Sequence, residues 1–401
     1  MADTASPPAT PPVTPPATPL AASFAAQPVR GAGILPSQML RHLIESCDIQ
    51  AEAPIEEAQV QPASLDLRLG AVAYRVRASF LPGQGVTVRQ KIDQFGMHEI
   101  DLSRGAVLER GCVYIVPLME RLRLRAGIAG LANPKSSAGR LDIFTRVITD
   151  GGEAFEAIPA GYEGPLYAEI APRTFSVLVH QGTRLNQLRL RKGQPGLSAT
   201  ELHALHAAQQ LTDRPLERDD LRGGVPFSVD LSGDTAAPGF ADGVIGYRAR
   251  RNAGLIDFDN IGTYAIEDFW EPLRAVRGGL VLDPDDFYIL ASKESVSVPP
   301  DHAAEMVAYD TSVGEFRVHY AGFFDPGFGH GAAGGREGDG IGSRGVLEVR
   351  SHDVPFLIED GQRVGRLIYE KLAAAPDKLY GQGIGSSYQR QGLTLGKQFR
   401  R

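Results

Sequence analysis

Cysteine is scarce in this sequence, and negative charges outnumber positive ones. Only two cysteines occur among its 401 residues, Cys47 and Cys112, and neither belongs to a CxxC pair. This excludes a disulfide framework and a cysteine-rich zinc site, and it is typical of proteins from a reducing cytoplasm. The formal net charge is −7, whereas nucleic-acid-binding proteins typically carry a basic surface patch. A negative net charge also does not favour docking on anionic membranes. We therefore expect a cytoplasmic protein with no nucleic-acid or membrane partner.

Long hydrophobic runs are missing as well. No run approaches the ~18 apolar residues that a membrane-spanning helix needs. Residues 1–32 are rich in proline, threonine and alanine, and they lack the basic segment followed by an apolar segment that marks a secretory signal. Their composition predicts an extended, disordered tail outside the fold, and a proline-rich partner-binding segment is the alternative.

The remainder of the chain carries an internal repeat. The blocks "LERGCVYIVPLMERLRLR" and "LDPDDFYILASKESVSVP" align without gaps from Leu108 and Leu282. Further on, a glutamate and a later glycine recur at the same spacing in both copies. The matched positions are Glu169 with Glu348 and Gly182 with Gly361. Several matches in the same order indicate a duplication.

Each copy consists mostly of short runs rich in Val, Ile, Leu and Tyr, separated by Gly, Pro and Asp. This pattern predicts an all-β barrel or sandwich rather than alternating helices and strands. We expect one helix in "LPSQMLRHLIES", with Ser37 as N-cap, and another in "SATELHALHAAQQL", where Ser198 and Glu201 have the spacing of a capping box.

These patterns divide the chain into five segments. Both ends are tails, and a helix with a polar linker joins the two copies. The segments are the tail at 1–32, a first domain at 33–200, the linker at 201–224, a second domain at 225–372 and the C-terminal tail at 373–401.

One polar loop, "NPKSSAGRLDI", interrupts the apolar runs and contains Lys135, Ser136, Ser137 and Arg140. Small residues let backbone N–H groups approach an anion, hydroxyls donate further hydrogen bonds, and a guanidinium can bind two oxygens. The loop therefore predicts a phosphate site, and an exposed polar turn is the open alternative. A Walker A loop is excluded, because GxxxxGK[ST] does not occur.

Other motifs accompany this loop in a fixed order. "VQPASLDLRLG" precedes it, and "AGYEGPLYAEI" and "GTRLNQLRL" follow. The second copy adds "YAGFFDPGFG" and "VLEVR", and the C-terminus adds "KLYGQGIGSSYQRQG". This order resembles the superfamily of dCTP deaminases and dUTPases, and the double length is similar to fused bacterial dCTP deaminases. The resemblance implies a mainly β fold, made of two tandem dUTPase-like β-clip barrel domains with a few short helices.

The resemblance also implies site residues. Ser136 and Arg140 correspond to groups of the deamination centre, and its catalytic glutamate corresponds to Glu169 or Glu348. The expected cofactor is Mg²⁺ bound through the triphosphate rather than by protein side chains. Zinc is not expected, since the PCxxC of zinc deaminases is missing. The residues expected to bind the nucleotide are Lys135, Ser137, Ala321, Gly322, Asp325, Gly327, Lys378, Tyr380 and Gln382.

The two copies are not equivalent. Opposite the serine-rich loop the second copy reads "YDTSVG", without the paired serines or the arginine, while the first copy has Asp150 where the second has Ala321. In the superfamily, phosphate and base contacts come from different subunits. We therefore hypothesise one composite site per chain, with Glu169 auxiliary or vestigial. Its members are Ser136, Ser137 and Arg140 from the first copy and Ala321, Asp325 and Glu348 from the second.

The leading expectation is an enzyme that hydrolyses dCTP to dUTP and ammonia, feeding dUMP and dTTP synthesis, with a glutamate moving protons. One alternative is a dUTPase or a bifunctional enzyme that gives dUMP, with Asp150 as the candidate carboxylate. Another is a nucleotide-binding regulator without turnover. "GLIDFDN" is interpreted as an ordinary strand opposite "SLDLRLG", and His180 as a surface or hydrogen-bonded residue. The resemblance further implies dTTP as feedback inhibitor and a homo-oligomer, either a trimer or a pseudo-hexameric arrangement of repeats.

Overall fold

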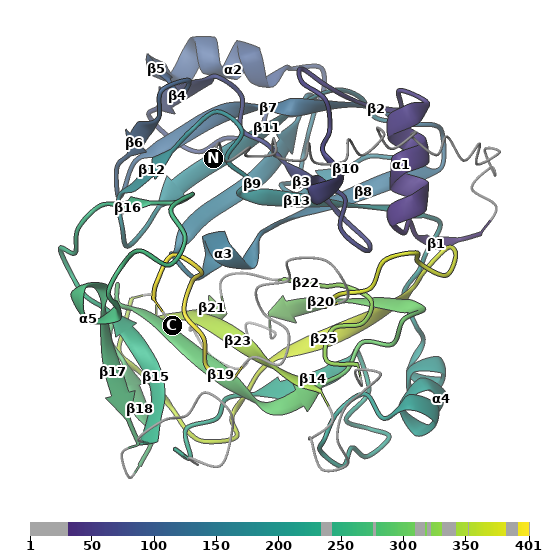
Figure 1. Ribbon diagram of the computed structural model, residues 1–401, viewed down its shortest axis with the longest axis vertical. Helices are drawn as coiled ribbons and strands as arrows, with labels where there is room; N and C mark the ends of the chain where they lie inside the picture. Colours follow the sequence, from purple (N-terminus) through teal and green to yellow (C-terminus); the bar gives the residue numbers. More distant parts are fainter. Residues whose placement is uncertain are drawn as a thin grey trace, which may run out of the picture.

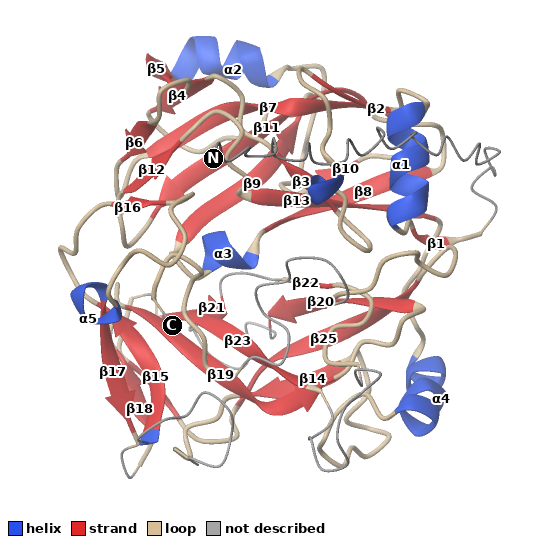
Figure 2. Cartoon of the chain, in the orientation of Figure 1, coloured by secondary structure: helices blue, strands red, loops and turns tan. Residues whose placement is uncertain are grey.

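The computed structural model of the protein describes residues 31–233, 243–275, 278–308, 317–318, 322–330, 342–351, 353–381 and 392–400. Strands dominate these ranges, and the helices are few and short (Figure 2). The predicted mainly β fold class is therefore confirmed. The predicted site residues Ala321 and Gln382 lie outside the described residues, as do "YDTSVG" and most of the proline-rich tail.

The first copy of the repeat (purple to teal in Figure 1) forms two main sheets and part of a third. Its strands are β1 (Gly33–Ile34), β2 (Ile49–Ala51), β3 (Leu65–Leu67), β4 (Val72–Val76), β5 (Gly96–Asp101), β6 (Ala106–Leu108), β7 (Val113–Arg123), β8 (Ile128–Pro134), β9 (Ile143–Thr149), β10 (Ala157–Ile158), β11 (Glu163–Pro172), β12 (Val177–Val179) and β13 (Asn186–Lys192). One sheet has the order β1-β13-β8-β10, with β3 on β13, and the other has the order β5-β4-β7-β11-β9, with β2 on β7.

The second copy (green to yellow) lies below the first in Figure 1. Its strands are β14 (Val225–Ser228), β15 (Val244–Ala249), β16 (Ile256–Asp257), β17 (Trp270–Arg274), β18 (Leu280–Leu282), β19 (Phe287–Val296), β20 (His302–Ala308), β21 (Arg317–Val318), β22 (Phe323–Phe324), β23 (Ser343–Arg350), β24 (Phe356–Ile358) and β25 (Arg363–Lys371). Its sheets have the orders β14-β25-β20-β22, β17-β15-β19-β23-β21 and β18-β24.

The hydrogen bonding of the strands repeats along the chain. The pairs β7–β11, β8–β13 and β6–β12 of the first copy recur as β19–β23, β20–β25 and β18–β24 in the second. The register repeats as well, because Glu169 pairs with Ile115 and Glu348 pairs with Ile289. The duplication inferred from sparse sequence matches is thus present in the backbone.

Short helices decorate the sheets. They are α1 (Ser37–Glu45), the 3₁₀ turn η1 (Glu57–Gln59), α2 (Val88–Phe95), α3 (Ser136–Gly139), α4 (Ala199–Gln209) and α5 (Ile266–Phe269). Ser198 caps α4 in the predicted capping box with Glu201. The predicted N-cap of α1 is wrong, since Pro36 holds that position and the Ser37 hydroxyl donates to Asp377 instead. Sequence reasoning also missed α2, although Thr87 and Gln90 form a capping box at its start.

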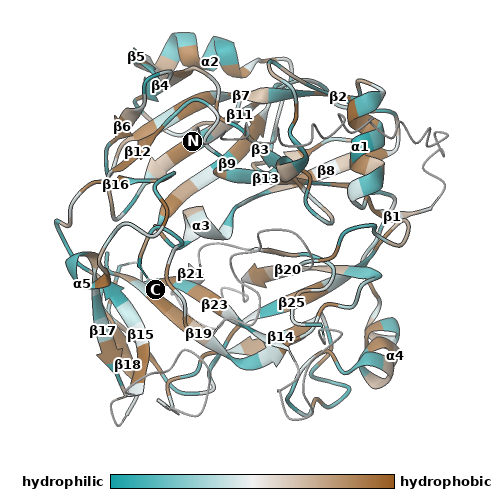
Figure 3. Cartoon of the chain, viewed as in Figure 1, coloured by the Kyte–Doolittle hydropathy of each residue, from teal (hydrophilic) through white to brown (hydrophobic). Residues whose placement is uncertain are grey.

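Three kinds of contact join the two copies. Strand β16 extends the first copy's β12–β6 ladder in parallel. Arg350, at the end of β23, makes a buried ion pair with Asp142, and the ring of Phe175 lies 5.6 Å from that of Trp270 in a shared apolar core. Apolar residues (brown in Figure 3) concentrate on central strands such as β19 and β20, whereas α1 carries both apolar and polar bands. None of the helices in the described ranges combines the length and hydropathy that crossing a bilayer requires.

Candidate functional site

A cavity of about 730 Å³ lies where the two copies meet, and we call it the central cavity. Its volume is within the range of roughly 300–1,000 Å³ that is typical of small-molecule sites. Both copies contribute to its wall. The lining residues include Asp66, Lys135, Ser136, Ser137, Arg140 and Arg184 from the first copy and Phe258, Asp259, Gly322, Phe323, Phe324, Asp325, Phe328, Glu348, Tyr380 and Lys397 from the second.

The predicted phosphate loop forms one side of the central cavity. It follows β8 directly, and its serines begin the single turn α3. The hydroxyl-bearing Ser136 is exposed, whereas Ser137 is 4% and Arg140 2% exposed. Lys135 makes an ion pair with Asp66, which also lines the cavity. The loop therefore presents hydroxyl groups and two cationic side chains to the central cavity, as an anion site requires.

Glu348 approaches this loop from the second copy. It lies on β23 and is 4% exposed. Burial raises the pKa of its carboxyl group to about 7, and the positive charge of Arg140 partly opposes that rise. A carboxyl group that titrates near neutral pH can both accept and return a proton, which is what general acid–base catalysis needs.

Glu169 occupies the equivalent register position but does not line the central cavity. Its Oε1 lies 2.6 Å from Nη2 of Arg146, and the guanidinium carbon of Arg146 lies 4.6 Å from the ring centroid of Phe144 and 3.3 Å from that of Phe155. Glu169 is 1% exposed, and its carboxylate is thus paired with an arginine whose guanidinium lies against two aromatic rings. Of the two predicted glutamates, the structure brings only Glu348 together with Ser136 and Arg140.

The motif "YAGFFDPGFG", whose residues are expected to bind the nucleotide, contributes another part of the wall. Gly322 and Asp325 line the cavity, and Asp325 lies 3.3 Å from Nη2 of Arg189. Burial raises the pKa of Asp325, and Arg189 opposes the rise. Gly327 does not line the cavity, but its φ is +92°, and a Cβ added at this position would lie 3.2 Å from the backbone nitrogen of Tyr380. Glycine is the residue that fits such a backbone without strain.

Of the predicted C-terminal tail residues that the structure describes, one lines the central cavity and one does not. Tyr380 lines the cavity, and its ring centroid lies 5.5 Å from that of Phe328. Lys378 instead lies outside the lining, where it donates to the carbonyl oxygen of Val60 at 3.0 Å and makes an ion pair with Glu57. Asp150, the candidate for triphosphate hydrolysis, also lies outside, since its carboxylate accepts the N–H of Val88 at the start of α2.

Sequence reasoning missed several lining residues. The interpretation of "GLIDFDN" needs correction, because β14 rather than this segment is the counterpart of β3. Only Ile256 and Asp257 are in a strand, and the following Phe258 and Asp259 line the cavity. Lys397 lies beyond the last motif, "KLYGQGIGSSYQRQG", so no local signal points to it; its position depends on how the end of the chain folds back.

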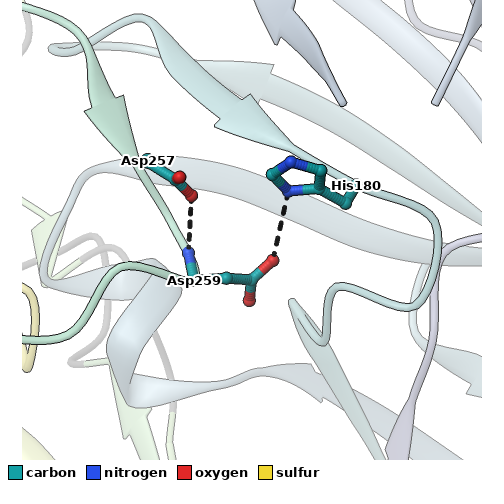
Figure 4. Close-up of side chains that lie close together, drawn as sticks. All are labelled: His180, Asp257 and Asp259. Atoms are coloured by element: carbon teal, nitrogen blue, oxygen red, sulfur yellow. Dashed lines mark hydrogen bonds and ion pairs between the residues drawn. The ribbon is translucent and has the colours of Figure 1, made fainter. Parts of the chain in front are cut away.

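One group of side chains, which includes the lining residue Asp259, has the composition of a metal site. His180, Asp257 and Asp259 offer ligand atoms that all lie within 4.8 Å of one another, and within the described part of the chain this is the group that could hold a cation. Figure 4 shows the imidazole Nδ1 facing the carboxylate of Asp259 at 3.7 Å, and the N–H of Asp259 donating to Asp257. The Asp259 carboxylate also accepts the hydroxyl of Thr183.

Comparisons with known proteins agree on one family. Residues 31–194 match the model of the 2'-deoxycytidine 5'-triphosphate deaminase N-terminal domain, and residues 198–399 match that of the C-terminal domain. Among solved structures, the chain is similar to 2'-deoxycytidine 5'-triphosphate deaminase from Agrobacterium tumefaciens, with a TM-score of 0.79 and 54% identity over 86% of this chain and all of that one.

Curated relatives match over shorter stretches. A "dCTP deaminase, dUMP-forming" from Halobacterium salinarum is 33% identical over 115 residues, and a "dCTP deaminase" from Natronomonas pharaonis is 30% identical over 117 residues. In each case the match covers 28% of this chain and 52% of the relative, so the chain spans about half the length of these two proteins. Because the two family models together match nearly all of the described chain, the protein belongs to the 2'-deoxycytidine 5'-triphosphate deaminase family.

Proposed function

We propose that this protein hydrolyses dCTP to dUTP and ammonia in the central cavity. The observation that carries the proposal is that Glu348, with a pKa of about 7, shares one cavity with Ser136 and Arg140 from the other copy. The proposal includes two dUTPase-like β-clip barrel domains, at 33–200 and 225–372, whose different motifs combine in one site. A cytoplasmic homo-oligomer, inhibited by dTTP, is also part of it.

In this mechanism Glu348 accepts a proton from water as the water oxygen bonds to C4 of cytosine. The proton passes to ring nitrogen N3, and the second proton of the water passes to the amino group. The C4–N bond then breaks, its electron pair leaves with ammonia, and a carbonyl remains at C4. Ser136 orients the water, and Arg140 stabilises the negative charge that develops during attack. The buried position of Glu348 keeps bulk water away from these steps.

The aromatic wall suits the base. Phe324 and Phe328 meet edge to face, with ring centroids 4.9 Å apart, and Tyr380 continues the cluster. Flat apolar surfaces of this kind can contact either face of a pyrimidine, while Asp325 and the backbone of Gly322 hydrogen-bond its edge. Arg189 keeps Asp325 in place from the neighbouring β13.

The phosphates lie against Lys135, Ser136 and Ser137 in this proposal. Magnesium, when bound with the nucleotide, neutralises part of the triphosphate charge and is held through phosphate oxygens. Zinc has no part, because the chain lacks the paired cysteines that zinc deaminases use.

A second product is favoured by one observation, since the Halobacterium salinarum relative is named "dUMP-forming". Such a reaction needs a carboxylate that activates water near the α-phosphate. Asp66 and Asp259 line the cavity, whereas the predicted candidate Asp150 does not.

The experiment is product analysis of the purified protein with dCTP and Mg²⁺. We expect dUTP and ammonia to appear in equal amounts. Detection of dUMP and diphosphate in place of dUTP would establish the bifunctional reaction, and tight dCTP binding without ammonia release would leave only a binding protein.

A further inference from the structure

Arg189 extends from the first copy to two strands of the second. It lies on β13, where it pairs with Leu131 of β8, and it is 2% exposed. Its Nη1 donates to the carbonyl oxygen of Ala304 on β20 at 3.0 Å, and its Nη2 donates to that of Phe324 on β22 at 3.4 Å. Ala304 and Phe324 are themselves partners in the ladder between β20 and β22. One guanidinium of the first copy thus binds two paired strands of the second.

Two buried carboxylates share this guanidinium. Oδ1 of Asp325, which directly follows β22, lies 3.3 Å from Nη2, and Oε2 of Glu370 on β25 lies 3.5 Å from Nη1. Both residues are 8% exposed, so water contributes little to stabilising their charges. Asp325 lines the central cavity and Glu370 does not. Arg189 therefore provides a positive charge that favours the ionised form of Asp325, against the effect of burial on the pKa of this carboxyl group.

An aromatic ring also contacts the guanidinium. The guanidinium carbon of Arg189 lies 4.0 Å from the ring centroid of Phe323, the first residue of β22. Arg189 thus contacts three consecutive residues of the cavity wall, which are Phe323, Phe324 and Asp325. It does not line the cavity itself. A side chain in this place can orient the wall, but it does not touch a molecule inside the cavity.

The internal repeat indicates that the strand itself does not require an arginine here. The match of Gly182 with Gly361 places Ile368 at the position equivalent to Arg189. The two residues occupy the same register, in the equivalent strand pairs β13–β8 and β25–β20. A half-buried isoleucine therefore supports the same pairing. The arginine occurs in the copy that contacts the "YAGFFDPGFG" motif, so this motif explains it better than the fold of β13 does.

We propose that Arg189 is a positioning residue for the nucleoside, because it holds the carboxylate of Asp325 in the orientation in which this carboxylate accepts a hydrogen bond from the substrate. This inference rests on the proposed function, in which Asp325 hydrogen-bonds the nucleoside half of dCTP. An ionised carboxylate only accepts hydrogen bonds, so Asp325 favours a donor such as the amino group of cytosine. The nucleoside half of the site then depends on a side chain of the first copy, as the phosphate half does.

The test is a double-mutant cycle between Arg189 and Asp325, made in Glu348→Gln so that dCTP is not consumed. Arg189→Met and Asp325→Ala are introduced singly and together, and calorimetry measures the affinities for dCTP and for inorganic triphosphate. The ratio of the two affinities isolates the nucleoside contacts, because inorganic triphosphate has no nucleoside. A hydrogen bond to a charged group is worth about 10- to 100-fold in affinity. We expect Arg189→Met to lower the ratio by that factor when Asp325 is present, and to change it little in Asp325→Ala.

Arg189→Lys keeps the charge and should retain most of the ratio. Arg191→Met, on the same strand and outside the cavity wall, should behave as Glu348→Gln alone. If Arg189→Met leaves the ratio unchanged, or lowers it by the same factor in Asp325→Ala, the proposal is overturned. If Arg189→Met also loses inorganic triphosphate, its fold is lost. Arg189→Gln, which keeps hydrogen-bond donors for the two carbonyl oxygens, then takes its place in the cycle.

Turnover separates this inference from the proposed function. With Glu348 present, Arg189→Met should raise KM for dCTP by more than it lowers kcat, because Arg189 acts on the orientation of the nucleoside and not on the proton transfers. If the wild type does not deaminate dCTP, the proposed function fails, yet the binding cycle still decides the role of Arg189.

Discussion

Replacing Glu348 with glutamine should remove activity and at the same time stabilise the folded protein at alkaline pH. In the folded state burial raises the pKa of this carboxyl group from the ordinary 4.5 to about 7. Between these two values the folded protein keeps a proton that the unfolded chain has lost, so the free energy of unfolding falls as pH rises. Above pH 7 the wild type bears the full cost of a buried, ionised carboxylate. Glutamine resembles the protonated form and bears none of it.

The magnitude follows from the two pKa values of Glu348, 4.5 and about 7. Since a tenfold change in an equilibrium constant corresponds to ~1.4 kcal/mol, Glu348→Gln should raise the free energy of unfolding by ~3 kcal/mol at pH 8.5. Near pH 5 the unfolded carboxyl group is only partly ionised, and the gain should fall below ~1 kcal/mol.

The assay is urea unfolding of Glu348→Gln and wild type at pH 5 and pH 8.5, followed by circular dichroism. Glu359→Gln serves as the control, because Glu359 is an exposed carboxylate in the same copy. It should change stability little at either pH. Equal stabilities of Glu348→Gln and wild type at pH 8.5 would show that burial does not hold this carboxyl group near neutrality, and the proposed proton shuttle would lose its basis.

Three further results are expected. Glu169→Gln should retain deamination, whereas Glu348→Gln should lose it by at least ~100-fold, and full activity in Glu348→Gln would contradict the composite site. The kcat/KM for dCTP should rise with pH and level off above about 7, because Glu348 must be ionised to accept a proton; a profile flat from pH 5 to 9 would contradict this. Arg350→Met should lower the free energy of unfolding by roughly 3 kcal/mol, since it removes the guanidinium that pairs with the buried carboxylate of Asp142; unfolding curves that match the wild type would argue against a structural role for this pair.

Sequence signals predicted a helix start correctly where the capping hydrogen bonds join neighbouring residues. The capping box of Ser198 and Glu201 begins α4 as expected, because its hydrogen bonds join residues three apart. The same rule failed at Ser37, whose hydroxyl binds Asp377, 340 residues away. It was not applied at Thr87, where a capping box begins α2. Caps are reliable only when no distant partner competes for the hydroxyl group.

The candidate site likewise combines features that local sequence indicates with features that depend on packing between distant residues. Residue types alone indicated that "NPKSSAGRLDI" could bind phosphate and that one of two glutamates could serve as base. The motifs missing from each copy favoured Glu348 over Glu169, although both occupy the same register in repeated strands.

The sequence by itself determined the mainly β fold, the duplication and the chemistry available to each copy, since alternation, spacing and motif order are properties of neighbouring residues. Tertiary structure adds that Glu348 lines the same cavity as Arg140, whereas Glu169 is paired with Arg146. It also brings Lys397 and Asp259 into the wall of the cavity, through the C-terminal segment 392–400 and the segment after β16, which lie far from the phosphate loop in the sequence. The physical reason is that burial and charge depend on packing between the two copies, and no stretch of one copy contains that information.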